Sequence, residues 1–566
     1  ATAAFTVTVP GKRGPARQPS ITTDGSGGSG GPNAGQDGQK GQDRQEGQEG
    51  RDKNTPPPPT LRTFPAGSYI VRMDQPYSRI ADSLMDYQYW SPNDPQKTPY
   101  DDTGWTFPEL FNAQAVRVAD VRVLEAPVEK MTAAIRAKGR LTPSTELKAG
   151  DTGSVFVVNH NADLALVTLR YRLKSASFEA AEEPFEAGGK TFNRGSFIIK
   201  NAAAAEIEKA ATDLGLQIMV AGAAPSVKTH PVRAPRVALL HTWLSTQTEG
   251  WWRQAFDNAQ VPYTYISTQQ ISNDASLNAK YDVIVFPPVG RGPEGIVSGM
   301  PMWGNALPWK KTAETPNLGS EDQTDDMRPG LGYTGIANLQ TFVRKGGLFL
   351  TVMDTADLAV STGFTPGLSV TARQRLRVVG SVVRSKTIDA TSPIAYGYTD
   401  NLALWCDNGP IFNVSNVFGG RGGRRLGPDD GGNRPTGRGT ADDPDTPQGR
   451  VGVEVANEPR TETWQAVPIT DEQLRNGINV IPPAARPRVV LRYADTRDLL
   501  VSGLVENGGE IAQHAAVVDV PLDKGHVVAF SNNPIWRGET EGSYFLVFNA
   551  LLNFDQLDAG RKLDPR

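Results

Sequence analysis

Cysteine is almost absent from this chain of 566 residues, which contains only Cys406. One cysteine cannot form an intrachain disulfide, and it excludes a zinc site built from several thiolates. Histidine is also scarce, and none of the five has the spacing of a zinc site, which needs about three protein ligands. We therefore expect this chain to hold no metal and no other cofactor.

Long apolar runs are missing as well, since no stretch reaches the roughly 18 apolar residues of a membrane-spanning helix. The 58 basic and 62 acidic residues are mixed along the chain and leave a formal net charge of −4. This balance argues against nucleic acid or a membrane surface as a partner. The first residues, ATAAFTVTVP, do not have the pattern of a signal peptide. We interpret residues 1–10 as a strand left from a missing upstream domain.

Two tracts have almost no apolar residues and should be disordered, because they cannot bury enough surface to offset the entropy of ordering. The first is a low-complexity linker over residues 11–60, and the second is an insert over residues 419–450. The arginines of the insert alternate with aspartates and lack aromatic neighbours, which also argues against nucleic-acid binding.

Residues 61–149 are predicted to form a small α+β segment with strands at 68–73 and 115–124 and a short helix at 80–87. Its unusual part is SPNDPQKTPYDDTGW, residues 91–105, with three prolines, three aspartates and two aromatic residues. Asp94, Asp101 and Asp102 could ligate Ca²⁺, although the spacing is not that of an EF-hand. The prolines and Trp105 instead favour a rigid brace, with the absent domain as a possible docking partner.

Residues 150–230 are predicted to form a small α/β module. The strand SVFVVN leads into a helix that Asn161 should cap, and SFIIKN leads into one that Asn201 should cap. In the second helix, apolar residues recur at helical spacing, at Ile207, Ala210, Ala211 and Leu214.

Residues 231–556 give the clearest pattern, followed by a tail at 557–566. The runs RVALL, TYI, DVIVFPP and GGLFLTV are continuously apolar and alternate with helical stretches, which indicates a parallel sheet covered on both faces. The fold class is therefore α/β, an open flavodoxin-like domain preceded by smaller modules.

Ligands of such sheets bind outside the carboxyl ends of the strands. Polar residues of this domain that should lie there are the candidate crevice residues His241, Glu249, Asp354, Arg537 and Glu539. Helix capping and loop bracing explain the same positions without a ligand, so a site forms only if the side chains converge.

This domain resembles the class I glutamine amidotransferase-like group, which includes the trehalose-utilisation type. The resemblance implies a nucleophile at the elbow after GGLFLTV, but VMDTAD, residues 352–357, contains neither Cys nor Ser. Cys406 lies far from that elbow in the sequence, and we expect it to be a buried apolar filler. We therefore assign no catalytic residue.

Three further segments resemble large bacterial zinc carboxypeptidase-like proteins of the carboxypeptidase A/B class. They are residues 63–110 (TFPAGSYIVRM to DDTGWTFPEL), residues 156–199 (FVVNHNAD to NRGSFII) and residues 525–552 (GHVVAFSNNPIWRGETEGSYFLVFNALL). The resemblance implies a secreted or periplasmic peptidase whose zinc and catalytic residues lie upstream. This chain would then be an accessory region for substrate capture or domain docking, with the upstream peptidase domain as its partner.

Two alternatives remain from the sequence. One is a module binding carbohydrate or cell-wall glycan, in which Trp243, Trp251, Trp252 and Trp303 serve as stacking platforms. The other is a hydrolase acting at the crevice of the amidotransferase-like domain, so whether the chain is an enzyme stays open. A peptide or a cell-wall glycan is the expected ligand.

Overall fold

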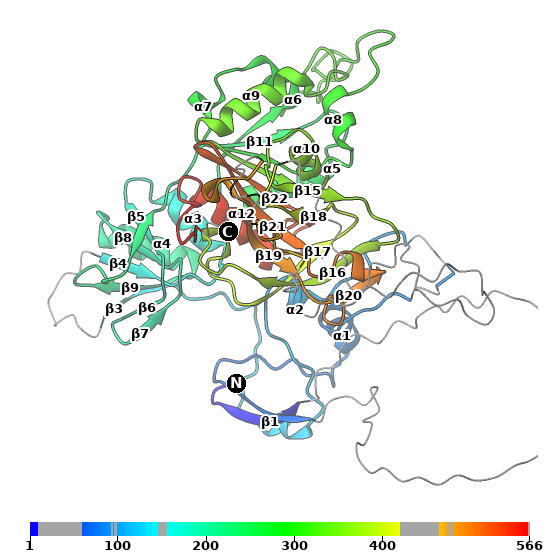
Figure 1. Ribbon diagram of the computed structural model, residues 1–566. Helices are drawn as coiled ribbons and strands as arrows, with labels where there is room; N and C mark the ends of the chain where they lie inside the picture. The colour runs from blue at the N-terminus through cyan, green and yellow to red at the C-terminus, as the bar shows by residue number, and fades with distance from the viewer. Residues whose placement is uncertain are drawn as a thin grey trace, which may run out of the picture. The chain divides into compact units, whose positions relative to one another are not determined.

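The computed structural model describes residues 1–9, 59–91, 94–95, 99–144, 155–418, 463–470, 473, 475 and 479–563 (Figure 1). The predicted disorder of residues 11–58 and 419–450 lies outside these residues. The chain divides into two compact units. The small unit comprises Ala1–Ser78 and Ala115–Thr132, and the large unit comprises Arg79–Gln114 and Ala133–Arg566.

The small unit is built on a two-stranded antiparallel ribbon of β1 (Phe5–Val9) and β2 (Thr60–Phe64). The linker predicted to reach residue 60 therefore ends earlier. The Asp120 carboxylate accepts a hydrogen bond from the backbone N–H of Thr8 at 2.8 Å and begins the 3-10 helix η1 (Val121–Glu125). The strands predicted at 68–73 and 115–124 are wrong. These apolar segments have no neighbouring strand to pair with, and sheet propensity is expressed only in such a context.

The large unit begins with two short helices, α1 (Ser78–Met85) and α2 (Phe107–Leu110). The helix predicted at 80–87 is confirmed with a shift of two residues at each end.

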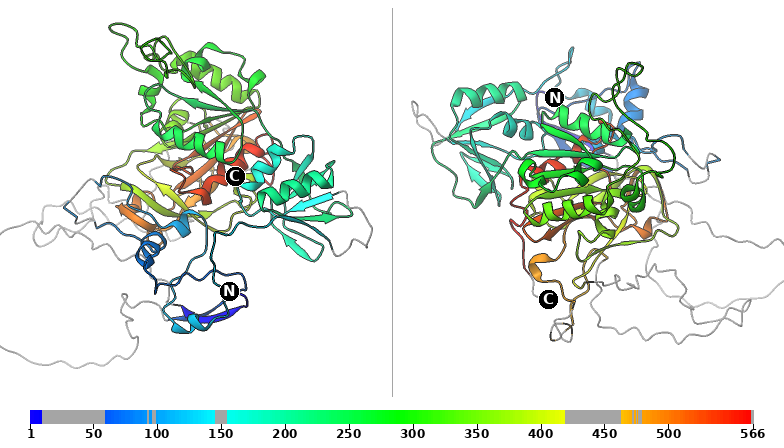
Figure 2. Two further views of the ribbon diagram at one scale, coloured as in Figure 1. Left: turned by 180° about the vertical axis from the view of Figure 1, so that it is seen from behind. Right: turned by 90° about the horizontal axis from the view of Figure 1, so that it is seen from above.

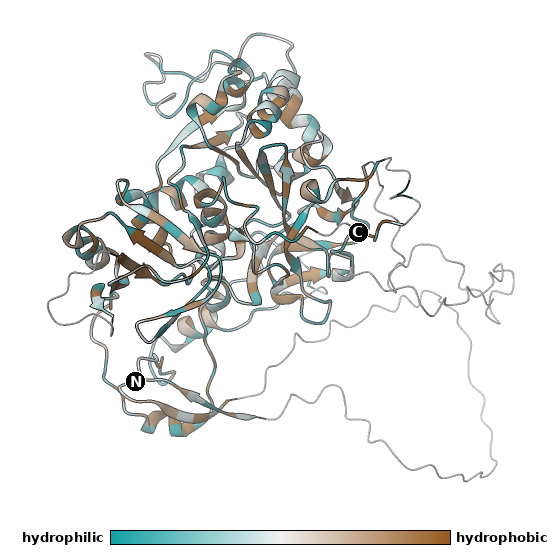
Figure 3. Cartoon of the chain, turned by 60° about the vertical axis from the view of Figure 1, so that its left-hand side comes forward, coloured by the Kyte–Doolittle hydropathy of each residue, from teal (hydrophilic) through white to brown (hydrophobic). Residues whose placement is uncertain are grey.

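A small α/β module follows, and its apolar strands carry strong hydrophobic colour in Figure 3. Its six-stranded sheet has the order β10-β5-β8-β4-β9-β3. The strands are β3 (Arg140–Pro143), β4 (Val155–Val158), β5 (Ser177–Ala181), β8 (Phe197–Lys200), β9 (Gln217–Ala221) and β10 (Thr229–Pro231), with a hairpin of β6 (Phe185–Ala187) and β7 (Lys190–Phe192).

The module has two helices, α3 (Ala165–Arg172) and α4 (Ala204–Leu214), and both predicted caps are wrong. Asp163, not Asn161, accepts a hydrogen bond from the backbone N–H of Ala165 at 2.9 Å. Asn201 adopts φ 57° in the turn before α4, which begins without a side-chain cap. The predicted apolar stripe of α4 is confirmed, with Ile207, Ala210 and Ala211 buried.

The main sheet has a parallel part in the order β12-β11-β13-β14-β22. Numbered along the chain, this is the order 2-1-3-4-5 of flavodoxin-like folds, so the predicted fold class is confirmed. The strands are β11 (Val237–His241), β12 (Tyr263–Ser267), β13 (Val283–Phe286), β14 (Leu348–Val352) and β22 (Gly525–Phe530).

Helices cover both faces of the parallel part, as the continuously apolar strands require (Figure 2). Side chains of α5 (Gln247–Asn258) and α12 (Glu541–Leu552) pack on the face that contains Leu239 and Val285. The face that contains Leu240 and Phe286 packs against residues of five other helices. These are α6 (Thr268–Asn273), α7 (Leu277–Lys280), α8 (Pro293–Ser298), α9 (Gly332–Arg344) and α10 (Asp354–Ser361).

An antiparallel part extends the sheet from β22 through β21, β19, β16 and β17. Its strands are β15 (Leu368–Thr371), β16 (Arg377–Thr387), β17 (Asn401–Cys406), β18 (Ile411–Val414), β19 (Arg488–Tyr493), β20 (Leu500–Glu506) and β21 (Ala515–Leu522), and short 3-10 helices η2 (Pro393–Ala395), η3 (Pro483–Ala485) and η4 (Gly508–Glu510) connect them. No helix among the described residues is long and apolar enough to cross a membrane.

Candidate functional site

The candidate site lies at the carboxyl ends of β11 and β12, next to the β11/β13 position where the flavodoxin-like order reverses direction. His241 is the last residue of β11, and only 1% of it is exposed. Its Nε2 atom lies 2.9 Å from Oδ2 of Asp322, and its Nδ1 atom lies 3.3 Å from the backbone oxygen of Thr242. Both ring nitrogens therefore face oxygen acceptors.

Tyr265 links His241 to Glu249. The Tyr265 ring stacks on the His241 ring with centroids 4.0 Å apart, and its hydroxyl donates to Oε1 of Glu249 at 2.6 Å. Glu249 lies in the first turn of α5 and is 2% exposed. Its second oxygen, Oε2, is buried and has no hydrogen-bond partner among the described residues. Burial raises the pKa of Glu249, because it disfavours the charged carboxylate.

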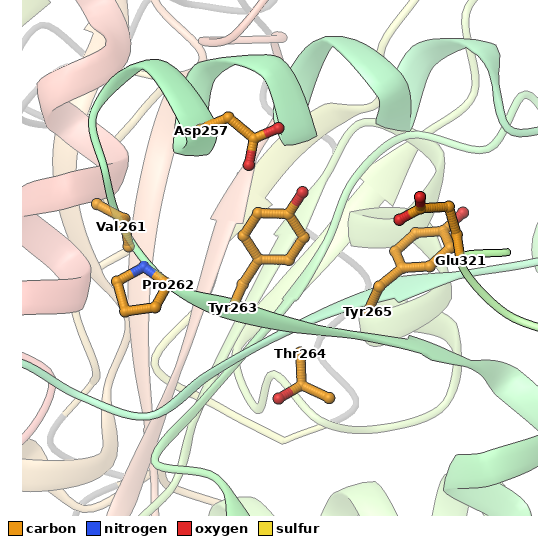
Figure 4. Close-up of a pocket in the computed structure, with 7 residues that line it drawn as sticks. All are labelled: Asp257, Val261, Pro262, Tyr263, Thr264, Tyr265 and Glu321. Atoms are coloured by element: carbon orange, nitrogen blue, oxygen red, sulfur yellow. The ribbon is translucent and has the colours of Figure 1, made fainter.

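Aromatic and charged side chains surround this pair. The Arg253 guanidinium lies 4.6 Å from the centroid of the Tyr265 ring and binds Oε2 of Glu321 at 2.6 Å. Trp243 packs edge-on against His241, and its Nε1 atom is buried without a partner among the described residues. Tyr265 and Glu321 also line an open hollow of about 520 Å³. Its other lining residues, drawn with these two in Figure 4, are Asp257, Val261, Pro262, Tyr263 and Thr264.

Asp354 braces a loop instead of joining His241 and Glu249. Its carboxylate accepts hydrogen bonds from the backbone N–H groups of Val289, at 3.1 Å, and Arg291, at 2.9 Å. Burial raises the pKa of Asp354 to about 6, against the effect of these hydrogen bonds. The bracing interpretation therefore holds for this residue.

The elbow before α10 keeps a strained backbone without a nucleophile. Met353 adopts φ 54° and ψ −114°, a conformation that costs a non-glycine residue about 1–3 kcal/mol. A nucleophilic enzyme would place a serine or cysteine here, whereas a thioether has no proton to lose to a base. Cys406 is fully buried, as predicted, and burial raises the pKa of its thiol to about 12.

Arg537 and Glu539 belong to a third group, which contains the aspartates of the 91–105 loop. Arg537 Nη1 lies 2.5 Å from Asp101 Oδ1 and 3.5 Å from Asp102 Oδ2. The indole N–H of Trp536 donates to Asp102 Oδ2 at 2.6 Å. Burial, and next the charge of Asp102, raise the pKa of Glu539 to about 7.

The 91–105 loop is therefore a brace, and it packs on this chain's own sheet. The backbone N–H groups of Thr103 and Gly104 both donate to the carbonyl of Gly380 in β16. Asp101 is paired with the Arg537 guanidinium, and Asp102 accepts from the Trp536 indole N–H. The loop thus holds the segment after β22 against β16. Calcium binding by its aspartates stays an alternative, which the effect of a chelator on stability tests.

The five candidate residues therefore separate into three groups. His241 and Glu249 meet at Tyr265, Asp354 holds the loop after β13, and Arg537 with Glu539 joins the brace. Sequence reasoning missed Tyr265 and Asp322. The alternation of YTYI along β12 is a signal for the first, whereas Asp322 lies in an irregular segment that gives none.

Other residues weighed from the sequence have structural roles. His160 is buried and its Nε2 atom lies 3.1 Å from Oδ1 of Asn549 on α12. Among the proposed stacking platforms, Trp252 is fully buried and donates to Asn533, while Trp303 is 83% exposed. No group of three His, Cys, Asp or Glu residues in the described part of the chain is arranged to hold a metal ion.

No protein-family model matches the chain, and no curated protein matches its sequence. Similar solved structures include a cytoplasmic protein from Salmonella typhimurium, at 10% identity and TM-score 0.26, covering 56% of this chain and 97% of that one. A ThuA-like protein from Bacteroides uniformis has 8% identity and TM-score 0.27, with 58% and 94% covered. A β-galactosidase from Bacillus circulans sp. alkalophilus has 9% identity and TM-score 0.24, with 56% and 31% covered. Likenesses at this level carry no argument about function.

Proposed function

We propose that this chain is an accessory region of a zinc carboxypeptidase-like protein, and that its small unit docks on the peptidase domain. The observation that carries the proposal is the exposed apolar surface of the small unit. Among its described residues, Val7 and Val9 are the buried hydrophobic ones. Nine large hydrophobic side chains are exposed, namely Leu61, Tyr69, Val71, Met73, Tyr77, Val121, Leu124, Val128 and Met131.

A surface of this kind calls for a partner. A two-stranded ribbon is at best marginally stable by itself in water. Large exposed apolar side chains that cluster in one unit mark an interaction site more often than isolated ones do. The peptidase domain is the occupant to which the resemblance of residues 63–110 leads, because that segment resembles the part of such proteins that follows the catalytic domain.

An accessory role also agrees with the chemistry of the large unit. The elbow presents Met353, and the thiol of Cys406 is buried with a raised pKa, so neither position offers a nucleophile. The crevice of His241 and Glu249 is suited to binding, which supports a role in substrate capture. By the same resemblance, we propose a secreted or periplasmic location.

The test is direct binding of this chain to the peptidase domain that the proposal places upstream, measured by calorimetry. We expect Tyr77→Ser combined with Val121→Ser to weaken binding at least tenfold, because both side chains are exposed on the small unit. Tyr333→Ser is the matched control, since Tyr333 is at least as exposed, on α9 of the large unit, and its change should leave binding unchanged. Equal binding by all three proteins, or no binding by the unmodified chain, would overturn the docking role.

A further inference from the structure

The segment between α8 and α9, residues 300–330, forms a long excursion over the crevice, here called the lid. Its base is closed by pairing of Gly299 with Pro329, and its middle by pairing of Trp309 with Thr324. Met302, Trp303 and Leu307 are exposed on the lid, together with charged residues such as Lys310. Glu321 and Asp322 lie near the end of the lid.

These two successive carboxylates are the lid's contacts with the crevice. Glu321 binds Arg253, and Asp322 binds His241, as described above. The Asp322 side chain is only 8% exposed. Gln270 on α6 also donates to Asp322 Oδ1 at 3.4 Å. The lid thus inserts a carboxylate into a buried site at the end of β11.

The buried ring of His241 requires a hydrogen-bond acceptor such as the Asp322 carboxylate. With 1% of the residue exposed, a ring N–H of His241 that lost Asp322 would be buried without an acceptor. An unsatisfied buried donor is costly, so the site requires an oxygen acceptor at this position. The lid shows which chemistry fits there, because it supplies a carboxylate from within the chain.

Two polar atoms beside His241 are left unused by the lid. Glu249 Oε2 and Trp243 Nε1 are both buried without a partner among the described residues. A carboxylate held by His241 needs neither of them. A ligand that also carries an N–H group could donate to Glu249, and a carbonyl oxygen of the same ligand could accept from Trp243.

We propose that this crevice binds the free C-terminus of a peptide, whose carboxylate replaces that of Asp322 at His241. A terminal residue carries a carboxylate, an amide N–H and a neighbouring carbonyl within a few bonds, the three groups that the crevice can pair. The lid competes with the peptide for His241, so binding displaces Glu321 and Asp322. This inference rests on the substrate-capture part of the proposed function and names its ligand class.

The test compares N-acetyl-dialanine with its C-terminal amide, by calorimetry, on the full chain. We expect the double variant Glu321→Gln, Asp322→Ala to bind the acid at least tenfold more tightly than the unmodified chain, because the internal competitor is gone. Neither protein should bind the amide. Asp325→Asn is the matched control, since Asp325 lies on the same lid and pairs with Lys310 in solvent, so this variant should bind like the unmodified chain.

A third variant tests whether the carboxylate of the ligand binds at His241. His241→Gln, added to the double variant, should abolish binding of the acid. If the double variant does not fold, hydrogen exchange of the unmodified chain tests the same point. Saturating N-acetyl-dialanine should accelerate amide hydrogen exchange in residues 300–330, and its C-terminal amide should not. Equal affinity for acid and amide, or no gain on removing the two lid carboxylates, would overturn the proposal. Docking of the small unit would be unaffected by that result, because it is measured with the peptidase domain and different variants.

Discussion

Glu539 should make the protein less stable as the pH rises through neutrality. It lies half-buried in the loop between β22 and α12, near Asp101 and Asp102, with Arg537 as the neighbouring cation. Burial is the larger cause of its raised pKa, about 7 in the folded protein against an ordinary value of 4.5. The neutral acid is therefore favoured by folding.

The direction of this change in stability with pH follows from the protons that Glu539 binds in the folded and unfolded states. Between pH 4.5 and about 7, folded Glu539 keeps a proton that the unfolded chain has released. Its favourable contribution is complete below pH 4.5 and is lost as the pH rises through the folded pKa. The full difference corresponds to about 3 kcal/mol. Because about half of the side chain faces solvent, screening should reduce the effect to about 1 kcal/mol.

Glu539→Gln removes this effect, since the amide has similar size and never ionises. We expect the variant to be more stable than the unmodified protein by about 1 kcal/mol at pH 8 and to have equal stability at pH 4.5. Urea unfolding at a series of pH values measures the difference, with Glu208→Gln on the exposed face of α4 as the control. A variant that is destabilised at pH 8, or that differs from the unmodified protein equally at both pH values, would refute the reasoning.

Two further predictions concern buried charge. Asp102→Ala should cost about 2–3 kcal/mol, because it leaves the Trp536 indole N–H and Arg537 without their shared acceptor. Half-buried Trp105→Ala should cost somewhat less, about 2 kcal/mol, and a chelator should change neither unfolding midpoint. A negligible loss for Trp105, or a midpoint that falls with chelator, would contradict the brace. The second prediction is that stability declines between pH 6.5 and about 9, by up to about 3 kcal/mol, as His526 loses its proton. Although burial opposes the charge, Asp519 at 2.8 Å raises the pKa of His526 to about 9, so His526→Gln should flatten this part of the profile, and an unchanged slope would contradict the pairing.

The parallel sheet could be predicted from the sequence because its strands are buried on both faces. Continuous apolar runs such as VALL and VIVF have no polar alternation, and their length is too short for a buried helix. The segments at 68–73 and 115–124 are rich in β-branched and other apolar residues, as strands are, and there the prediction failed. Such residues report a preference for a pleated surface, but pairing needs a neighbour, and these two segments have none in the structure.

For the candidate site, too, the sequence predicts positions but not interactions. His241 and Asp354 could be found because each follows a strand, and parallel strands place their carboxyl ends at one edge of the sheet. Their roles could not be found, since strand position does not tell a ligand-binding side chain from a loop brace. The backbone N–H groups that Asp354 accepts from lie more than sixty positions earlier in the sequence.

Asp322 shows why the remaining chemistry escapes a sequence argument, and also why it matters. The scaffold supplies a buried imidazole at the end of β11 and, on α5, a carboxylate whose Oε2 atom has no partner among the described residues. Buried polar atoms of this kind are costly without a complementary group. The complement to His241 comes from an irregular lid that carries no periodic signal, so only the folded chain identifies it. A site that is satisfied by a side chain of the same protein is a site with a competitor built in. Affinity for an external carboxylate is therefore set by the difference between two similar interactions, which makes the lid carboxylates the residues through which binding at this crevice can be tuned.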